Sequence, residues 1–143
     1  KRAGLVMALT AWETYVEDRV REEVDKRLQV VRGSYVGMFV AKRLEDELKR
    51  FHNPTAEKTK KLFHDFLEVD VAAGWEWANY DSAKAKKTLD DLISKRGDAV
   101  HRSKASMPGT PPGPHLVKRE ELEKAIRFLK CLVAVTDKAL LTS

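Results

Sequence analysis

The chain has 143 residues, of which 43% are hydrophobic and 34% are charged, and its formal net charge is +5. These values are typical of a soluble helical protein, and the length is sufficient for one domain with a hydrophobic core. No apolar run reaches the roughly 18 residues that a membrane span needs, and a signal peptide pattern is absent. A single cysteine, Cys131, excludes a disulfide framework within the chain. We therefore expect a cytoplasmic protein that does not contact membranes.

The first half of the chain has helical periodicity from its beginning. Because the sequence starts at Lys1 inside a helical pattern, we expect residues 1–143 to be a single helical domain of a longer chain. Apolar residues three or four apart predict a first helix over residues 5–28, and a second helix is expected over residues 35–51. Asn53 and Pro54 are typical of an N-cap and a first helical position, which predicts a third helix from there to residue 67.

The helical periodicity fails between residues 68 and 80, where Trp75, Trp77 and Tyr80 form an aromatic loop. These rings could stack on RNA bases, but we interpret the loop as a plug that closes one end of a helical bundle. A fourth helix begins near Ser82 and carries the candidate site residues.

The last part of the chain contains a loop and a final helix. Residues 106–114 are rich in proline and cannot be helical, so we expect a loop there. The last helix starts near Lys118 and has apolar residues in alternating steps of four and three, which predicts a long packing seam. The seam residues are Leu122, Ile126, Leu129, Val133, Thr136 and Leu140. With no β-type alternation of useful length, the sequence predicts an all-α bundle of four to five helices.

Arg96 lies on the apolar stripe of the fourth helix. That stripe is formed by Leu89, Leu92, Ile93 and Val100. A guanidinium cannot be neutralised by losing its proton, so a core-facing arginine is costly unless an anionic group meets it. Two interpretations follow: the side chain binds a phosphate, or it packs along the core and pairs with a carboxylate such as Glu13 or Asp98.

His101 follows Arg96 by five residues, which places it about 140° away around an ideal helix. One straight helix therefore does not direct both side chains to one point, and convergence requires a bend or a second subunit. RNA cleavage without a metal needs a base, an acid and positive charge at the phosphate, of which one histidine and one arginine supply only part. A two-fold dimer would supply the rest, because it brings the same patch from each subunit together.

Basic residues surround this pair and favour a polyanionic partner such as RNA, although such a run can also be a solvated helix face. They are Lys84, Lys86, Lys87, Lys95, Arg102, Lys104, Lys118 and Arg119. Among them, Lys95, Arg102 and Lys104 are the candidate RNA-binding residues. The histidines have no metal-ligand spacing with carboxylates, and the chain has no glycine loop that would bind phosphates, so we predict neither a metal site nor a cofactor.

Three segments of the chain are considered together. They are Ala-Trp-Glu-Thr-Tyr at residues 11–15, Asn-Pro-Thr-Ala-Glu-Lys at residues 53–58, and residues 92–101, which contain Arg96 and His101. In this order they resemble the HEPN superfamily, particularly its RiboL-PSP type. The resemblance implies an all-α bundle that dimerises so that two Arg-x4-6-His motifs face each other across a cleft. Many such proteins are metal-independent endoribonucleases that act as toxins or in defence against phage, and others are inactive and only bind RNA.

On this resemblance, Arg96 would stabilise the scissile phosphate and His101 would assist proton transfer, with a 2′,3′-cyclic phosphate as product. Gly97 stands where the family usually carries a polar residue, so either Asp98 takes over that role or the activity is weaker. Glu13 is the expected group that holds Arg96 or His101. The expected partners are RNA, a second copy of the chain and an antitoxin or fused domains. The alternatives are a catalytically inactive HEPN module that binds RNA or a partner protein, and a purely structural bundle.

Overall fold

A computed structural model describes residues 2–105 and 119–142, and within these ranges it describes the side chains of residues 3–97 and 119–142. The described chain is helical, with an isolated β-bridge between Trp77 and Tyr80 and no strand. Its elements are α1 (Arg2–Arg27), η1 (Gln29–Val31), α2 (Tyr35–Lys49), α3 (Ala56–Leu67), η2 (Val71–Gly74), α4 (Ser82–Ala105) and α5 (Arg119–Leu141). The predicted all-α bundle is therefore confirmed. The predicted loop at residues 106–114 lies outside the described residues.

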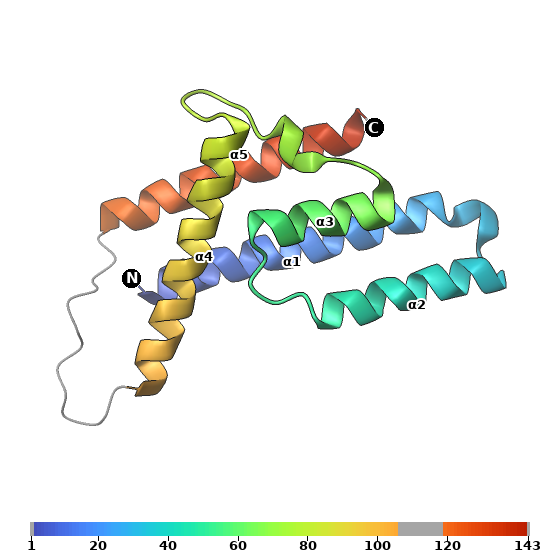
Figure 1. Cartoon of the computed structure of the whole chain (residues 1–143), viewed down its shortest axis with the longest axis horizontal. Helices are drawn as coiled ribbons and strands as arrows, with labels where there is room; N and C mark the ends of the chain where they lie inside the picture. The colour runs from blue at the N-terminus through green and yellow to red at the C-terminus, as the bar shows by residue number, and fades with distance from the viewer. Residues whose placement is uncertain (1, 106–118, 143) are drawn as a thin grey trace.

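The long helix α1 is the centre of the bundle and packs against each of the other four α-helices. Figure 1 shows α2 turning back along α1, α3 lying beside it, and α4 crossing it steeply. The short η2 helix contacts α3, α4 and α5, so it joins the two halves of the chain. Within the described ranges, no helix is both long and apolar enough to cross a membrane.

The buried core follows the predicted stripe of α1 and departs from the predicted seam of α5. Seven apolar residues make up the predicted stripe, and six of them are nearly inaccessible to solvent: Leu5, Leu9, Trp12, Val16, Val20 and Val24. The seventh, Leu28, lies just past the end of α1 and is half-buried. In α5 the buried side chains are those of Ala125, Phe128, Leu129, Leu132, Thr136 and Leu140. Of the predicted seam residues, Leu129, Thr136 and Leu140 are buried, whereas Leu122, Ile126 and Val133 are half-buried. Ile126 and Val133 line an apolar groove between α1 and α5.

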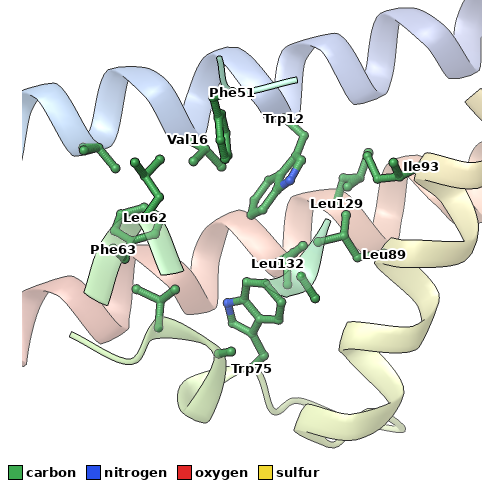
Figure 2. Packing of buried hydrophobic residues seen from close by; sticks show 14 of the residues in the cluster. Trp12, Val16, Phe51, Leu62, Phe63, Trp75, Leu89, Ile93, Leu129 and Leu132 are labelled. Carbon is green, nitrogen blue, oxygen red and sulfur yellow. The ribbon is translucent and has the colours of Figure 1, made fainter. Parts of the chain in front are cut away.

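Trp75 lies among the buried side chains of the core (Figure 2), so it packs inside the bundle, which fits the interpretation of the loop as a plug. Its ring is fully buried and lies edge-on to Trp12, with 6.3 Å between ring centroids. Its indole Nε1 donates a hydrogen bond to Thr136 Oγ1 at 3.0 Å. Trp77 and Tyr80 stack on each other at 4.7 Å, and both rings lie against Phe128 of α5. The aromatic loop therefore contributes packing, and the Trp75 ring is not available to stack on a base.

The start of α3 differs from the sequence prediction. Thr55, not Asn53, is the N-cap, and its hydroxyl accepts a hydrogen bond from the Lys58 N–H at 3.3 Å. Asn53 instead has a positive φ of 50°, a conformation that asparagine tolerates better than most residues. Proline disfavours a helical conformation at the preceding residue, so Pro54 keeps Asn53 out of the helix. The second helix also ends earlier than predicted, at Lys49, and Phe51 turns into the core.

The helix α2 has apolar side chains on two opposite faces. Its inner face packs through Leu44 and Leu48, and Gly37 is buried where a Cβ would come within 2.5 Å of the Val31 carbonyl oxygen. Its outer face and the preceding turn expose large apolar side chains: Val30, Tyr35, Val36, Met38 and Phe39. An exposed apolar area of this kind is uncommon on a monomeric surface.

The phenol of Tyr15 connects α1 to α5 and makes stability dependent on pH. Its hydroxyl donates a hydrogen bond to Asp137 Oδ1 at 2.5 Å, and Arg19 Nε lies 3.0 Å from the same oxygen. Burial, this hydrogen bond and the negative charge of Asp137 together raise the pKa of Tyr15 well above its ordinary value. In the folded protein the phenol therefore keeps its proton at a pH where the unfolded chain loses it.

We expect the free energy of unfolding to fall as the pH rises above about 10, the ordinary pKa of tyrosine. Because the pKa of Tyr15 is higher in the folded protein than in the unfolded chain, the stabilising contribution of the protonated phenol to the free energy of unfolding is fully present below pH 10. This contribution is lost progressively as the pH rises above 10. Between pH 9 and pH 11 this loss should reach about 1 kcal/mol in the wild type relative to Tyr15→Phe, which cannot ionise. Urea unfolding of both proteins across this range measures the difference, and parallel pH profiles would contradict the prediction.

Candidate phosphate-binding site

Arg96 is buried on the inward face of α4, as its position on the apolar stripe predicts. The residue is 8% exposed, and its neighbours on the stripe, Leu89 and Ile93, belong to the core. The charge of Arg96 thus lies in a largely apolar setting, where its electrostatic interaction with another charged group is stronger than in water.

Two side chains from other parts of the fold meet the Arg96 guanidinium. Its Nη1 lies 3.6 Å from Glu13 Oε2 on α1, and its Nη2 donates a hydrogen bond to Asn53 Oδ1 at 3.1 Å. The pairing with Glu13 was expected from the sequence. The contact with Asn53 was not, because Asn53 and Pro54 fit the N-cap and the first position of a helix. No local signal separates the two roles, since an N-cap residue also lies outside the helical conformation.

These contacts leave hydrogen-bonding capacity on Arg96. A guanidinium has five N–H donors in a fixed planar fork, and a carboxylate or phosphate can be bound by two of them at once. The hydrogen bond to Asn53 uses one N–H, and the Glu13 carboxylate lies beyond hydrogen-bond distance from Nη1. The geometry is compatible with a phosphate that binds to the remaining donors, and equally with an arginine whose role is structural.

The remaining predicted site residues lie on α4 around and beyond Arg96. Lys95 is exposed to solvent, as an RNA-binding residue would be. Gly97 is half-buried, and no described atom lies within 4 Å of the position that a Cβ would take. The helix α4 continues through Asp98, His101, Arg102 and Lys104, but the side chains of these four residues lie outside the described part of the structure. Their convergence with Arg96 stays a prediction.

Basic side chains are exposed along the described part of α4 and at the start of α5. They are Lys84, Lys87, Lys95 and Arg119. Among the residues whose side chains are described, no group of three histidine, cysteine, aspartate or glutamate residues could hold a metal ion.

The chain is an all-α bundle in which a buried arginine on α4 precedes a histidine by five residues, which is the arrangement that the resemblance to HEPN domains implies. The family model described as RiboL-PSP-HEPN matches residues 1–142, and the chain belongs to this family. No curated protein and no solved structure matches the chain.

Proposed function

We propose that this domain is a metal-independent endoribonuclease. The observation that carries the proposal is the buried Arg96, an ionised side chain held on the core-facing stripe of α4 in a chain of the RiboL-PSP-HEPN family. A fixed positive charge in a setting with little water stabilises the negative charge that develops on a phosphate during cleavage. This role explains why a costly buried charge stands where an apolar residue would otherwise pack.

Each proposed role follows from the chemistry of 2′-hydroxyl attack. Arg96 binds the scissile phosphate, and His101 moves a proton at the 2′-hydroxyl or at the leaving 5′-oxygen. The products are a 2′,3′-cyclic phosphate and a 5′-hydroxyl, so no water is consumed in the cleavage step. Glu13 holds Arg96, and Asp98 supplies the polar group that Gly97 lacks. Lys95, Arg102 and Lys104 bind the neighbouring phosphates of the strand.

The active species in this proposal is a homodimer. The helix α4 runs as one α-helix from Ser82 to Ala105, and positions 96 and 101 lie about 140° apart around an ideal helix. One chain therefore supplies half of a site. A two-fold axis near α4 brings two arginines and two histidines to one cleft, which provides both the acid and the base. An antitoxin, or further domains of the chain, would control access to that cleft.

A second candidate function is an inactive HEPN module that binds RNA or a partner protein. The observation that favours it is the environment of Arg96, because Glu13 and Asn53 already satisfy part of the guanidinium and Gly97 replaces a usual polar residue. Such a module would bind RNA without cleaving it, and its binding would survive His101→Ala but weaken with Arg96→Ala.

The decisive experiment compares wild type with His101→Ala on labelled RNA in the presence of a chelator. We expect the wild type to cleave with the chelator present, to leave 2′,3′-cyclic phosphate ends, and to sediment as a dimer. His101→Ala should lose cleavage while its helical content and dimer mass remain unchanged. Equal cleavage by both proteins, or cleavage that stops when the chelator is added, would contradict the proposal.

A further inference from the structure

The connection between α2 and α3 carries a side chain that touches the candidate site. Asn53 lies in this connection with a φ of 50°, and its Oδ1 accepts the hydrogen bond from Arg96 Nη2 at 3.1 Å. The two residues are 43 positions apart in sequence, so the contact exists only because the bundle brings the connection against α4.

The connection is fastened to α4 at a second point, which fixes the position of Asn53. Asp90, also on α4, accepts a hydrogen bond from the backbone N–H of Ala56 at 2.8 Å. Within the connection, Pro54 is buried and its carbonyl accepts a hydrogen bond from the Thr59 hydroxyl at 3.3 Å. The buried Phe51 precedes Asn53 and the buried Pro54 follows it, so Asn53 presents its amide oxygen from a fixed place.

The chemistry of the amide differs from that of the carboxylate on the other side of Arg96. The Asn53 oxygen is neutral, so it directs the guanidinium plane without cancelling its positive charge. Glu13, 3.6 Å from Nη1, opposes that charge and competes with a phosphate for the same face. A guanidinium binds a phosphate through two parallel N–H donors, and the plane of the fork decides whether both can reach it.

We infer that Asn53 is a positioning residue that sets the plane of the Arg96 guanidinium for phosphate binding in the transition state. The inference rests on the proposed ribonuclease function. The family usually carries a polar residue directly after the arginine, where this chain has Gly97. The inference instead places the polar group that contacts Arg96 on the connection between α2 and α3. The hydrogen bond from Arg96 to Asn53 leaves the positive charge of Arg96 intact. Asn53 therefore contributes to catalysis by orienting the guanidinium, and not only by strengthening RNA binding.

The test uses three variants of the full chain in steady-state RNA cleavage. Asn53→Gly removes the oxygen but tolerates the positive φ, so the backbone of the connection is preserved. Asn53→Asp keeps an acceptor at the same place and adds a negative charge. Thr55→Ala is the matched control, because it removes the N-cap of α3 without touching Arg96.

We expect Asn53→Gly to lower kcat about ten- to hundredfold with a small change in KM, because misorientation acts on the reacting geometry. Asn53→Asp should recover most of kcat but raise KM, since its charge opposes the phosphate. Thr55→Ala should keep kcat within about threefold although it lowers stability. Equal kcat values for wild type and Asn53→Gly, or an equal loss in Thr55→Ala, would overturn the inference.

A second readout does not depend on cleavage. Restricted rotation of a hydrogen-bonded guanidinium gives separate NMR signals for its Nη protons, and Arg96→Lys assigns those of Arg96. We expect these signals to merge in Asn53→Gly and to persist in Asn53→Asp and Thr55→Ala. If the wild type cleaves no RNA, the proposed function is wrong. In that case, an Asn53→Gly variant that loses both the separate Nη signals and its affinity for RNA would show that Asn53 positions Arg96 for RNA binding. Unchanged Nη signals in Asn53→Gly would overturn the positioning role.

Discussion

Arg96→Ala is expected to reduce RNA cleavage by a factor of about 10² to 10³, the effect of removing one group that stabilises an anionic transition state. The side chain is 10% exposed, so solvent screens its charge little and no exposed lysine can replace it in the same place. Arg96→Lys should recover only a small part of the loss, because an ammonium does not form the two parallel hydrogen bonds of a guanidinium. Initial rates on a short RNA measure both effects.

A matched pair of variants separates this catalytic role from a structural one. Arg96→Met keeps the apolar stem but leaves Glu13 unpaired, with 21% of its side chain exposed. Adding Glu13→Gln removes that unpaired charge and should restore part of the free energy of unfolding. If the role of Arg96 were purely structural, the double variant Arg96→Met, Glu13→Gln would regain activity together with stability. We expect the double variant to regain stability and to stay inactive.

Trp75→Ala is expected to lower the free energy of unfolding by about 3–5 kcal/mol, the usual cost of removing a large aromatic side chain from a core. The ring has no solvent exposure and contacts Trp12 edge-on, so its loss leaves a cavity between η2 and α1. The Thr136 hydroxyl keeps its own hydrogen bond to the Leu132 carbonyl at 2.7 Å, so the cost comes mainly from lost packing. Urea unfolding followed by circular dichroism measures it.

Two controls identify the source of that cost. Trp75→Phe retains an aromatic ring and should cost less than Trp75→Ala. Thr136→Val removes the acceptor of the indole N–H and should cost about 1–3 kcal/mol, because it leaves a buried donor unpaired. If Trp75 stacked on RNA bases instead, Trp75→Ala would weaken RNA binding with little change in stability, and that result would contradict the plug.

Those parts of the fold that depend on local periodicity could be predicted from the sequence. The stripe from Leu5 to Val24 has steps of three or four residues, and its members are buried because α1 lies at the centre of the bundle. The buried position of Arg96 follows from the same rule applied to α4. An ionised residue at an apolar position is conspicuous, and its carboxylate partner on α1 was foreseeable by charge complementarity.

Features that depend on tertiary packing could not be predicted in the same way. Asn53 and Pro54 fit a helix start on local propensity, but the connection is held by α4 through Asp90 and Arg96, and the cap moves to Thr55. The direction of the α5 seam likewise depends on how α5 lies against α1 and η2. The spacing between Arg96 and His101 indicates a shared site only when a second subunit is considered.

The two-faced helix α2 has a consequence for how the domain opens. Its inner face rests mainly on α1, while Tyr35, Met38 and Phe39 on its outer face remain exposed, so little packing opposes its detachment. Local unfolding takes the elements with the fewest buried contacts first. The connection that follows α2 is held separately, by its contacts with Asp90 and Arg96 of α4, so detachment of α2 would stop before Asn53 and leave the hydrogen bond to Arg96 in place.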